Sequence, residues 1–198
     1  MTPVIEDKAL DQLFRAARSH NGWEDTPVSD VQLRALYEIV KWGPTTSNSQ
    51  PQRILFLRTQ KEKDRLKSAM SPSNQEKTIT APVVAILAYD LKYWEHIERF
   101  YPIVAKSYME RSRTDAAFTA QTAFRNATLQ GGYFIIAARA LGLDCGPMSG
   151  FDNAKVDAEF FPDGQWKSNF LCAIGEGDPA KLRSRYGRFE FDDVCRIL

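Results

Sequence analysis

The chain has 198 residues, 43% of them hydrophobic, and its 26 lysine and arginine residues against 25 aspartate and glutamate residues leave a formal charge of +1. These values suit a single globular domain over residues 1–198 with a packed core. They exclude the overall basic charge that attracts nucleic acid or an anionic membrane, so neither is expected as a partner.

Hydrophobic periodicity predicts a mixture of helices and strands. In chain order these are a helix over 6–19, a helix ended by Gly43-Pro44, a strand over 53–58, a charged helix over 61–69, a buried strand over 82–89, a long helix over 115–141, a strand over 167–174 and a short helix over 191–198. Ser29 and Gln32 form a capping-box pattern at the start of the second helix. Because no repeat or long linker divides this order, the sequence predicts one α+β domain.

The helix over residues 115–141 is apolar on nearly all sides toward its end. A helix of this kind is expected at the centre of the fold or against a second subunit. Gly131 and Gly132 within it each cost roughly 1 kcal/mol of helix propensity relative to alanine. We therefore expect another backbone or a ligand to approach this helix closely.

Several enzyme classes lack their motifs in this sequence. There is no P-loop and no GxGxxG fingerprint, and Ser149 in GPMSG is not midway between two glycines as the serine-hydrolase turn requires. Two histidines, His20 and His96, and three widely spaced cysteines form no metal-binding pattern. We expect no metal site and no active-site triad.

The thiols and the N-terminus bear on location. Three unpaired, scattered cysteines are typical of a reducing compartment. The N-terminal residues include acids where a signal peptide needs basic residues, and no run reaches the roughly 18 apolar residues of a membrane span. We therefore expect a cytoplasmic protein.

Small polar and basic residues stand at the ends of the apolar elements. They are Arg18-Ser19, PTTSNSQP (44–51), Asn74 and Lys77, PMSGFD (147–152) and RSRYGR (183–188). Each alone is more often a helix-end cation, a capped loop or a solvated charge cluster than a binding group. Together they suit one large ligand, because arginines bind a phosphate while amides and hydroxyls bind ring heteroatoms.

Five motifs in order resemble the FMN-dependent nitroreductase family over nearly the whole chain. They are RSHNGW (18–23), GPTTSNSQP (43–51), NQEK (74–77), GPMSGFD (146–152) and the basic tail (183–188). The resemblance implies a nitroreductase-like α+β fold with a central, mostly antiparallel sheet flanked by helices. It also implies an intertwined homodimer with two FMN sites at the subunit interface, where the helix over 115–141 would lie.

The resemblance further implies roles for single residues. The phosphate and ribityl end of FMN would be held by Arg18, Ser19, His20, Arg183 and Arg185. The partner subunit would contribute Pro44, Thr45, Thr46 and Asn48. The pyrimidine edge would meet Asn74 and Lys77, and flavin N5 would face the backbone of Ser149 and Gly150. The family usually has a second cation shortly after the Arg-Ser pair, where this chain has Asn21 and Gly22.

The implied activity is an NAD(P)H oxidoreductase that passes hydride through flavin N5 to a small acceptor. HNGW, KWGPT, TAFRN, RALGLD and PMSGFD are similar to the branch that reduces malonic semialdehyde to 3-hydroxypropionate. A broad reductase of nitroaromatics, quinones or enones needs the same site, and a non-catalytic FMN-binding protein is a third hypothesis. No catalytic residue is assigned, since the flavin half-reaction requires no side-chain acid or base. The sequence leaves NADH or NADPH open as the reductant.

Overall fold

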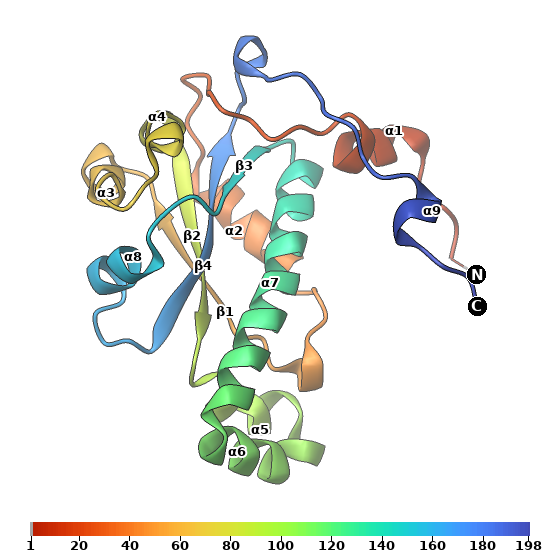
Figure 1. Ribbon diagram of the computed structural model, residues 1–198, viewed down its shortest axis with the longest axis vertical. Helices are drawn as coiled ribbons and strands as arrows, with labels where there is room; N and C mark the ends of the chain where they lie inside the picture. The colour runs from red at the N-terminus through yellow and green to blue at the C-terminus, as the bar shows by residue number, and fades with distance from the viewer. Residues whose placement is uncertain (1) are drawn as a thin grey trace.

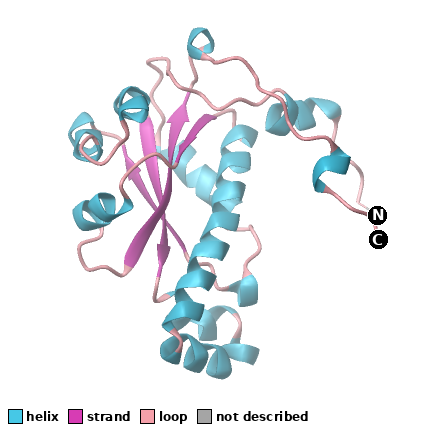
Figure 2. Ribbon diagram, in the orientation of Figure 1, coloured by secondary structure: helices cyan, strands magenta, loops and turns pink. Residues whose placement is uncertain are grey.

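The computed structural model describes residues 2–198, and within them a four-stranded antiparallel sheet has the order β1-β2-β4-β3. The strands are β1 (Gln52–Leu57), β2 (Val83–Asp90), β3 (Asp144–Met148) and β4 (Trp166–Gly175). Figure 2 shows the sheet flanked by helices on both faces. The predicted α+β class with a mostly antiparallel sheet is confirmed.

Helices form a layer on each face of the sheet (Figure 1). One layer contains α2 (Asp30–Val40) and α7 (Ala116–Ala140), and the other contains α3 (Gln60–Leu66), α4 (Pro72–Thr80) and α8 (Asn153–Phe160). Outside the layers are α1 (Asp7–Leu10), a π-helical turn (Asp11–Arg15), α5 (Ile97–Phe100), α6 (Ala105–Thr114) and α9 (Phe191–Val194). Single 3-10 turns occur at Thr46–Asn48, Tyr93–His96, Pro102–Val104 and Pro179–Lys181.

The two faces of β2 contribute to two separate cores. Its residues Val83, Ala85 and Leu87 belong to the cluster that contains side chains of α2 and α7. Val84, Ile86 and Ala88 belong to the cluster on the opposite face. Side chains alternate between the faces of a strand, so a strand covered on both faces reads as a continuous apolar run. This is why the segment PVVAILAY predicts a buried strand.

Two predicted helix ends can be compared with the structure. The Ser29 hydroxyl accepts the amide of Gln32 at 3.3 Å, and the Gln32 side chain accepts the amide of Ser29 at 2.9 Å, so the predicted capping box is confirmed. The first helical segment is shorter than predicted and ends at Arg15. Arg18 is therefore not a helix-end cation, and Ser19 forms an isolated parallel bridge with Cys145.

The two glycines of α7 have different surroundings. A Cβ on Gly131 would lie 2.5 Å from Cε1 of Phe170, whereas a Cβ on Gly132 would meet nothing within 4 Å. The close neighbour of Gly131 is thus an aromatic side chain of β4. The prediction that another backbone or a ligand approaches Gly131 is wrong. Its small size instead lets β4 and α7 pack together.

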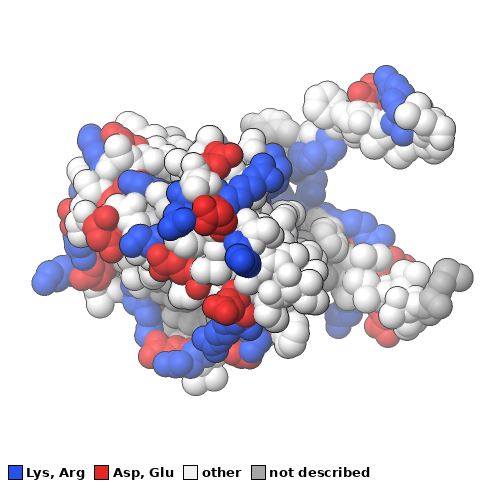
Figure 3. All heavy atoms as spheres, turned by 90° about the horizontal axis from the view of Figure 1, so that it is seen from below, with Lys and Arg blue, Asp and Glu red and all other residues white. Residues whose placement is uncertain are grey.

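Exposed apolar side chains mark α7 and both chain ends. On the outer face of α7, Phe124 and Leu129 are 50% and 49% exposed. Phe14 near the N-terminus and Tyr186 and Phe189 near the C-terminus are also exposed. Figures 1 and 3 show the two terminal segments projecting from the body as arms, while basic and acidic side chains are mixed over the face of the body seen in Figure 3. None of the helices in residues 2–198 has the length and hydropathy needed to cross a bilayer.

Candidate functional site

Three segments far apart in the sequence meet beside β3. They are residues 18–23, helix α4 with the turn that follows β3, and residues 177–185. The indole N–H of Trp23 donates to the carbonyl of Lys77 at 3.0 Å, and the Arg18 guanidinium donates to the carbonyl of Arg183. These contacts bring most of the sequence-predicted site residues into one region of a single chain.

The turn after β3 is fixed against α4. The carbonyl of Gly150 accepts the Asn74 side-chain amide at 3.1 Å and the Ser71 backbone amide at 3.0 Å. A Cβ on Gly150 would lie 2.6 Å from Nδ2 of Asn74 and 2.8 Å from Oγ of Ser71, so glycine is required for this close approach. The neighbouring Ser149 is exposed. The turn therefore presents a rigid backbone edge to the surface.

Four cations of this region, Arg18, Lys77, Arg183 and Arg185, lack acidic partners. Burial lowers the pKa of the Lys77 ammonium, and the positive charge of Arg183 lowers it further. In the described chain, neither these two residues nor Arg18 and Arg185 come within 4.0 Å of a carboxylate oxygen. Cations brought together without carboxylates are stabilised by an anionic ligand, which arginine can bind through paired hydrogen bonds.

The C-terminal segment is held against the N-terminal one. Arg185 donates from Nη2 to the carbonyl of Ala17 at 2.8 Å, close to where Arg18 contacts Arg183. Both contacts use the backbone carbonyl of the other segment as the acceptor. Arg183 and Arg185 of the basic tail are thereby placed next to the Arg18-Ser19 pair, and their contact with a cofactor phosphate stays a prediction.

His20 lies inside the protein rather than on the surface of the site. Its side chain is only 6% exposed, and its Nε2 lies 3.2 Å from a carboxylate oxygen of Asp144. The other oxygen of Asp144 accepts the amide of Gly177 at 3.0 Å. A Cβ on Gly177 would lie 1.8 Å from Nδ1 of His20. This geometry gives His20 a supporting position beneath the Arg18–Trp23 segment, and its contact with a phosphate stays a prediction.

The remaining predicted residues, Pro44, Thr45, Thr46 and Asn48, lie elsewhere in the chain. The amide of Thr46 donates to Oδ1 of Asn126 on α7 at 2.8 Å, and the Asn48 side chain donates to the carbonyl of Phe100 at 3.4 Å. In Figure 1 this 3-10 turn, in orange, lies beside the lower half of α7, while α4 lies on the other side of the sheet. Within this chain they lie apart from the first group of residues.

The loop that carries these residues has an unusual backbone. Ser47, Asn48 and Gln50 have φ values of 51°, 48° and 44°, in the left-handed region that non-glycine residues rarely adopt. The amide of Gln50 donates to the Thr45 hydroxyl at 3.1 Å, which helps to close the loop. Backbone strain of this kind persists only where surrounding contacts determine the conformation.

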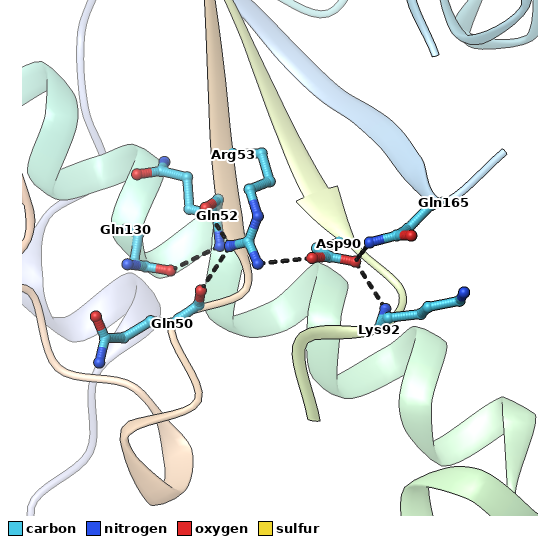
Figure 4. A network of polar contacts seen from close by, with 7 residues as sticks. All are labelled: Gln50, Gln52, Arg53, Asp90, Lys92, Gln130 and Gln165. Atoms are coloured by element: carbon cyan, nitrogen blue, oxygen red, sulfur yellow. Dashed lines mark hydrogen bonds and ion pairs between the residues drawn. The ribbon is translucent and has the colours of Figure 1, made fainter. Parts of the chain in front are cut away.

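A partly buried ion pair anchors the end of the loop, as Figure 4 shows. Arg53 donates to the carbonyl of Gln50 at 3.1 Å and to Asp90 at 2.6 Å. The side chain of Asp90 is only 2% exposed. The amide of Gln52 donates to Gln130 of α7 at 3.0 Å. The loop is thus tied to β1, β2 and α7 at once.

Sequence reasoning missed three residues that position the site: Trp23, Ser71 and Asp144. Trp23 stands in the motif HNGW, which is a strong marker of the family resemblance but gives no indication that the indole reaches the Lys77 carbonyl. Ser71 and Asp144 act through a backbone amide and a buried histidine, respectively. Neither contact follows a local sequence pattern.

Comparison with known sequences gives concordant results. A family model described as "Nitroreductase family" matches residues 3–176. A protein of Ralstonia nicotianae named "Putative NADH dehydrogenase/NAD(P)H nitroreductase" is 50% identical, and the match covers 99% of this chain and 100% of that protein. A protein of Polynucleobacter asymbioticus with the same name is 51% identical, with 100% of both chains covered.

Solved structures share the fold at low sequence identity. A nitroreductase-named structure from Bacillus subtilis has a TM-score of 0.83 at 22% identity, covering 98% of this chain and 100% of that one. A structure from Exiguobacterium sibiricum, described as a putative nitroreductase in complex with FMN, has a TM-score of 0.82 at 17% identity, with 100% of both chains covered. At these identities the likeness concerns the fold alone.

Proposed function

This chain belongs to the nitroreductase family of FMN-dependent NAD(P)H oxidoreductases, and from that premise we propose that it reduces malonic semialdehyde to 3-hydroxypropionate. The choice of acceptor is supported by the likeness of HNGW, KWGPT, TAFRN, RALGLD and PMSGFD to one branch of the family. One structural observation carries the assignment of the cofactor site. Four cations without carboxylate partners, Arg18, Lys77, Arg183 and Arg185, lie on the segments that hydrogen bonds to backbone carbonyls hold together.

The residues of this region fit FMN. We propose that Arg18, Arg183 and Arg185 hold the phosphate end, with Ser19 beside them, and that Asn74 and Lys77 bind the pyrimidine edge. The Gly150 turn allows close backbone approach because a side chain at this position would strike Asn74. When bound, FMN supplies a hydride acceptor and donor at N5.

Lys77 contributes electrostatic stabilisation in this proposal. A positive charge that is already in place stabilises negative charge as it develops, without a cost of reorganisation. Lys77 is half-buried, so solvent screens its charge less than it would on an open surface. The hydrogen bond from Trp23 to the Lys77 carbonyl holds the backbone of α4 in place at the residue that carries this charge.

We propose that the protein acts as a homodimer in which Pro44, Thr45, Thr46 and Asn48 complete the cofactor site of the partner subunit. The exposed apolar face of α7 and the exposed apolar side chains of both arms support this arrangement, because such surfaces usually mark protein interfaces.

Leu129→Glu is expected to shift the protein toward monomer, since it places a charge on the apolar outer face of α7. Sedimentation velocity measures the change. Val31→Glu serves as a matched control, because Val31 is an exposed apolar residue on α2 with 76% of its surface accessible. A Leu129→Glu protein that sediments like the Val31→Glu protein would argue against α7 as the interface helix.

The function is tested by anaerobic reduction of the holoprotein with NADH and with NADPH, followed by reoxidation with malonic semialdehyde, a quinone, an enone and a nitroarene. Rapid reduction and a strong preference for malonic semialdehyde are the expected results. Comparable rates with the other acceptors would favour a broad reductase, which needs the same site with a more open pocket. Tight FMN binding without oxidation of either nicotinamide would favour a non-catalytic FMN-binding protein.

Arg185→Ala is expected to raise the dissociation constant for FMN about tenfold, since an exposed hydrogen bond to a charged group contributes near the lower end of its usual range. Titration of the cofactor-free protein with FMN, followed by flavin fluorescence, measures this change. Arg188→Ala is the matched control in the same tail, because Arg188 donates only to the carbonyls of Tyr186 and Gly187. Equal affinities for the two variants would remove Arg185 from the site.

A cytoplasmic location is also part of the proposal. Cys145, Cys172 and Cys195 are all free thiols in the structure. Cys145 and Cys172 are both buried in the same core, on adjacent strands. Neighbouring thiols that stay reduced are usual in a reducing compartment.

A further inference from the structure

The side chain of Lys181 occupies the space that a side chain at position 22 would need. A Cβ on Gly22 would lie 2.1 Å from Cδ of Lys181 and 2.9 Å from both its Cβ and its Cγ. Gly22 does not have a positive φ, so its backbone conformation does not itself require glycine. Glycine is needed here because the aliphatic part of Lys181 crosses its Cα.

The backbone around Lys181 is held in place next to this glycine. The amide of Asp178 donates to the carbonyl of Gly22 at 3.0 Å. The Asp178 side chain then caps the 3-10 turn Pro179–Lys181 by accepting the amide of Ala180 at 2.8 Å. The start of the lysine side chain is therefore fixed against the Arg18–Trp23 segment.

The ammonium of Lys181 is only weakly engaged. Its Nζ lies 3.8 Å from Oε1 of Glu76, and these side chains are 49% and 78% exposed, respectively. An exposed pair at this distance contributes little to stability. Glu76 directly precedes Lys77 on α4, and Arg183 follows Lys181 by two positions. Lys181 thus links all three segments that form the candidate site, while its charge is available to a stronger anionic partner.

We propose that Lys181 is a further cofactor-binding residue. The family usually has a second cation where this chain has Asn21 and Gly22, and Lys181 supplies that positive charge from the C-terminal segment. This inference rests on the proposed function, because the anion it binds is FMN. On binding, the ammonium exchanges its long contact with Glu76 for the negatively charged cofactor. The long methylene chain of lysine suits this role, since it packs along Gly22 while the charged end stays mobile.

Lys181→Met keeps the packing on Gly22 but removes the charge. It is expected to weaken FMN binding about fivefold, as for a partly exposed charge pair, and to reduce the dependence of that affinity on salt. Titration of the cofactor-free protein with FMN at two salt concentrations measures both. Lys61→Met, at an exposed lysine of α3, is the control and should match the wild-type affinity.

Glu76→Gln separates binding from a purely structural role. If Lys181 serves the cofactor, releasing it from Glu76 leaves FMN affinity equal or higher, whereas Lys181→Met lowers it. If the lysine only holds Glu76, neither variant changes FMN affinity, which would overturn the inference. A wild-type protein that fails to bind FMN would refute the proposed function itself.

Moving the lysine from position 181 to position 22 gives an independent test. Gly22→Lys alone should lower the unfolding temperature, because the new side chain collides with Lys181. The Lys181→Gly background removes all three side-chain carbons that obstruct position 22, and Gly22→Lys should there restore most of the FMN affinity that Lys181→Gly loses. An affinity that stays at the level of Lys181→Gly would overturn the claim that a cation is required at this place.

Discussion

Replacing Lys77 with methionine is expected to make the bound flavin harder to reduce, by about 30–60 mV. The length of the side chain is kept, but the positive charge beside the pyrimidine edge is lost. A hydrogen bond to a charged group contributes roughly 1.5–3 kcal/mol, and about 1.4 kcal/mol corresponds to 30 mV for a two-electron couple. Anaerobic spectroelectrochemistry of the holoprotein measures the potential. Lys67→Met, at an exposed lysine that follows α3, is the control.

The lowered pKa of the Lys77 ammonium also determines how FMN binding is expected to depend on pH. Burial and the charge of Arg183 lower the pKa of Lys77 in the cofactor-free protein. An anionic ligand raises this pKa again, so FMN affinity is full below the lowered pKa and falls as pH rises through it. The fall should be missing in Lys77→Met. An unaltered reduction potential together with an unaltered pH profile would place Lys77 away from the flavin.

The lowered pKa of Lys77 also affects the stability of the cofactor-free protein, which rises with pH whereas FMN affinity falls. The unfolded chain binds the Lys77 proton more tightly than the folded chain does. The free energy of unfolding therefore gains a contribution from this group as pH rises from the lowered pKa toward its usual value.

Gly177→Ala is expected to lower the unfolding temperature by about 2–12 °C, because overpacking costs about 1–3 kcal/mol and each kcal/mol shifts a chain of this size by about 2–4 °C. The new methyl group would lie 1.8 Å from Nδ1 of His20, which is enclosed and cannot move without losing Asp144. Differential scanning calorimetry of the cofactor-free protein measures the change. FMN affinity should fall as well, since His20 supports the Arg18–Trp23 segment.

Gly187→Ala is the control for this substitution. A Cβ on Gly187 meets nothing within 4 Å, so the same chemical change is made without a collision. His20→Ala in the Gly177→Ala background removes the obstacle and should return part of the lost stability. Equal unfolding temperatures for Gly177→Ala and Gly187→Ala would show that the His20 ring is not confined as the structure places it.

The parts of the fold that sequence predicts well are those whose burial leaves an unambiguous pattern. β2 is apolar throughout because both of its faces are covered, and α7 repeats its pattern over seven turns of helix. The sequence does not predict β3, because its residues DCGPM include glycine and proline, which are poor strand formers. This strand exists through its pairing with β4, a tertiary interaction that overrides local preference. The polar helix α6 is missed for a similar reason, since it lacks a continuous apolar stripe.

The candidate site is predictable only in part. Family likeness implies a role for Arg18, Lys77 and Arg183, but the residues themselves do not reveal that a pair of hydrogen bonds to backbone carbonyls brings their segments together. The relation between Gly22 and Lys181 depends on the path of the C-terminal segment after β4. A glycine in the sequence indicates that space is needed without indicating what fills it. The role of the residues 44–48 stays a prediction, because it requires a second subunit.

The backbone of the loop over residues 44–50 restricts how this protein can diverge. Ser47, Asn48 and Gln50 hold left-handed conformations, which β-branched residues adopt only at a high energetic cost. Pro44 stands at the start of the loop, where a fixed φ limits exchange. Thr45 has an ordinary extended backbone with φ of −140°, and Thr46 is exposed. The Thr45 hydroxyl closes the loop by accepting the Gln50 amide, so Thr46 is the position of this loop where a side chain can change at the least structural cost.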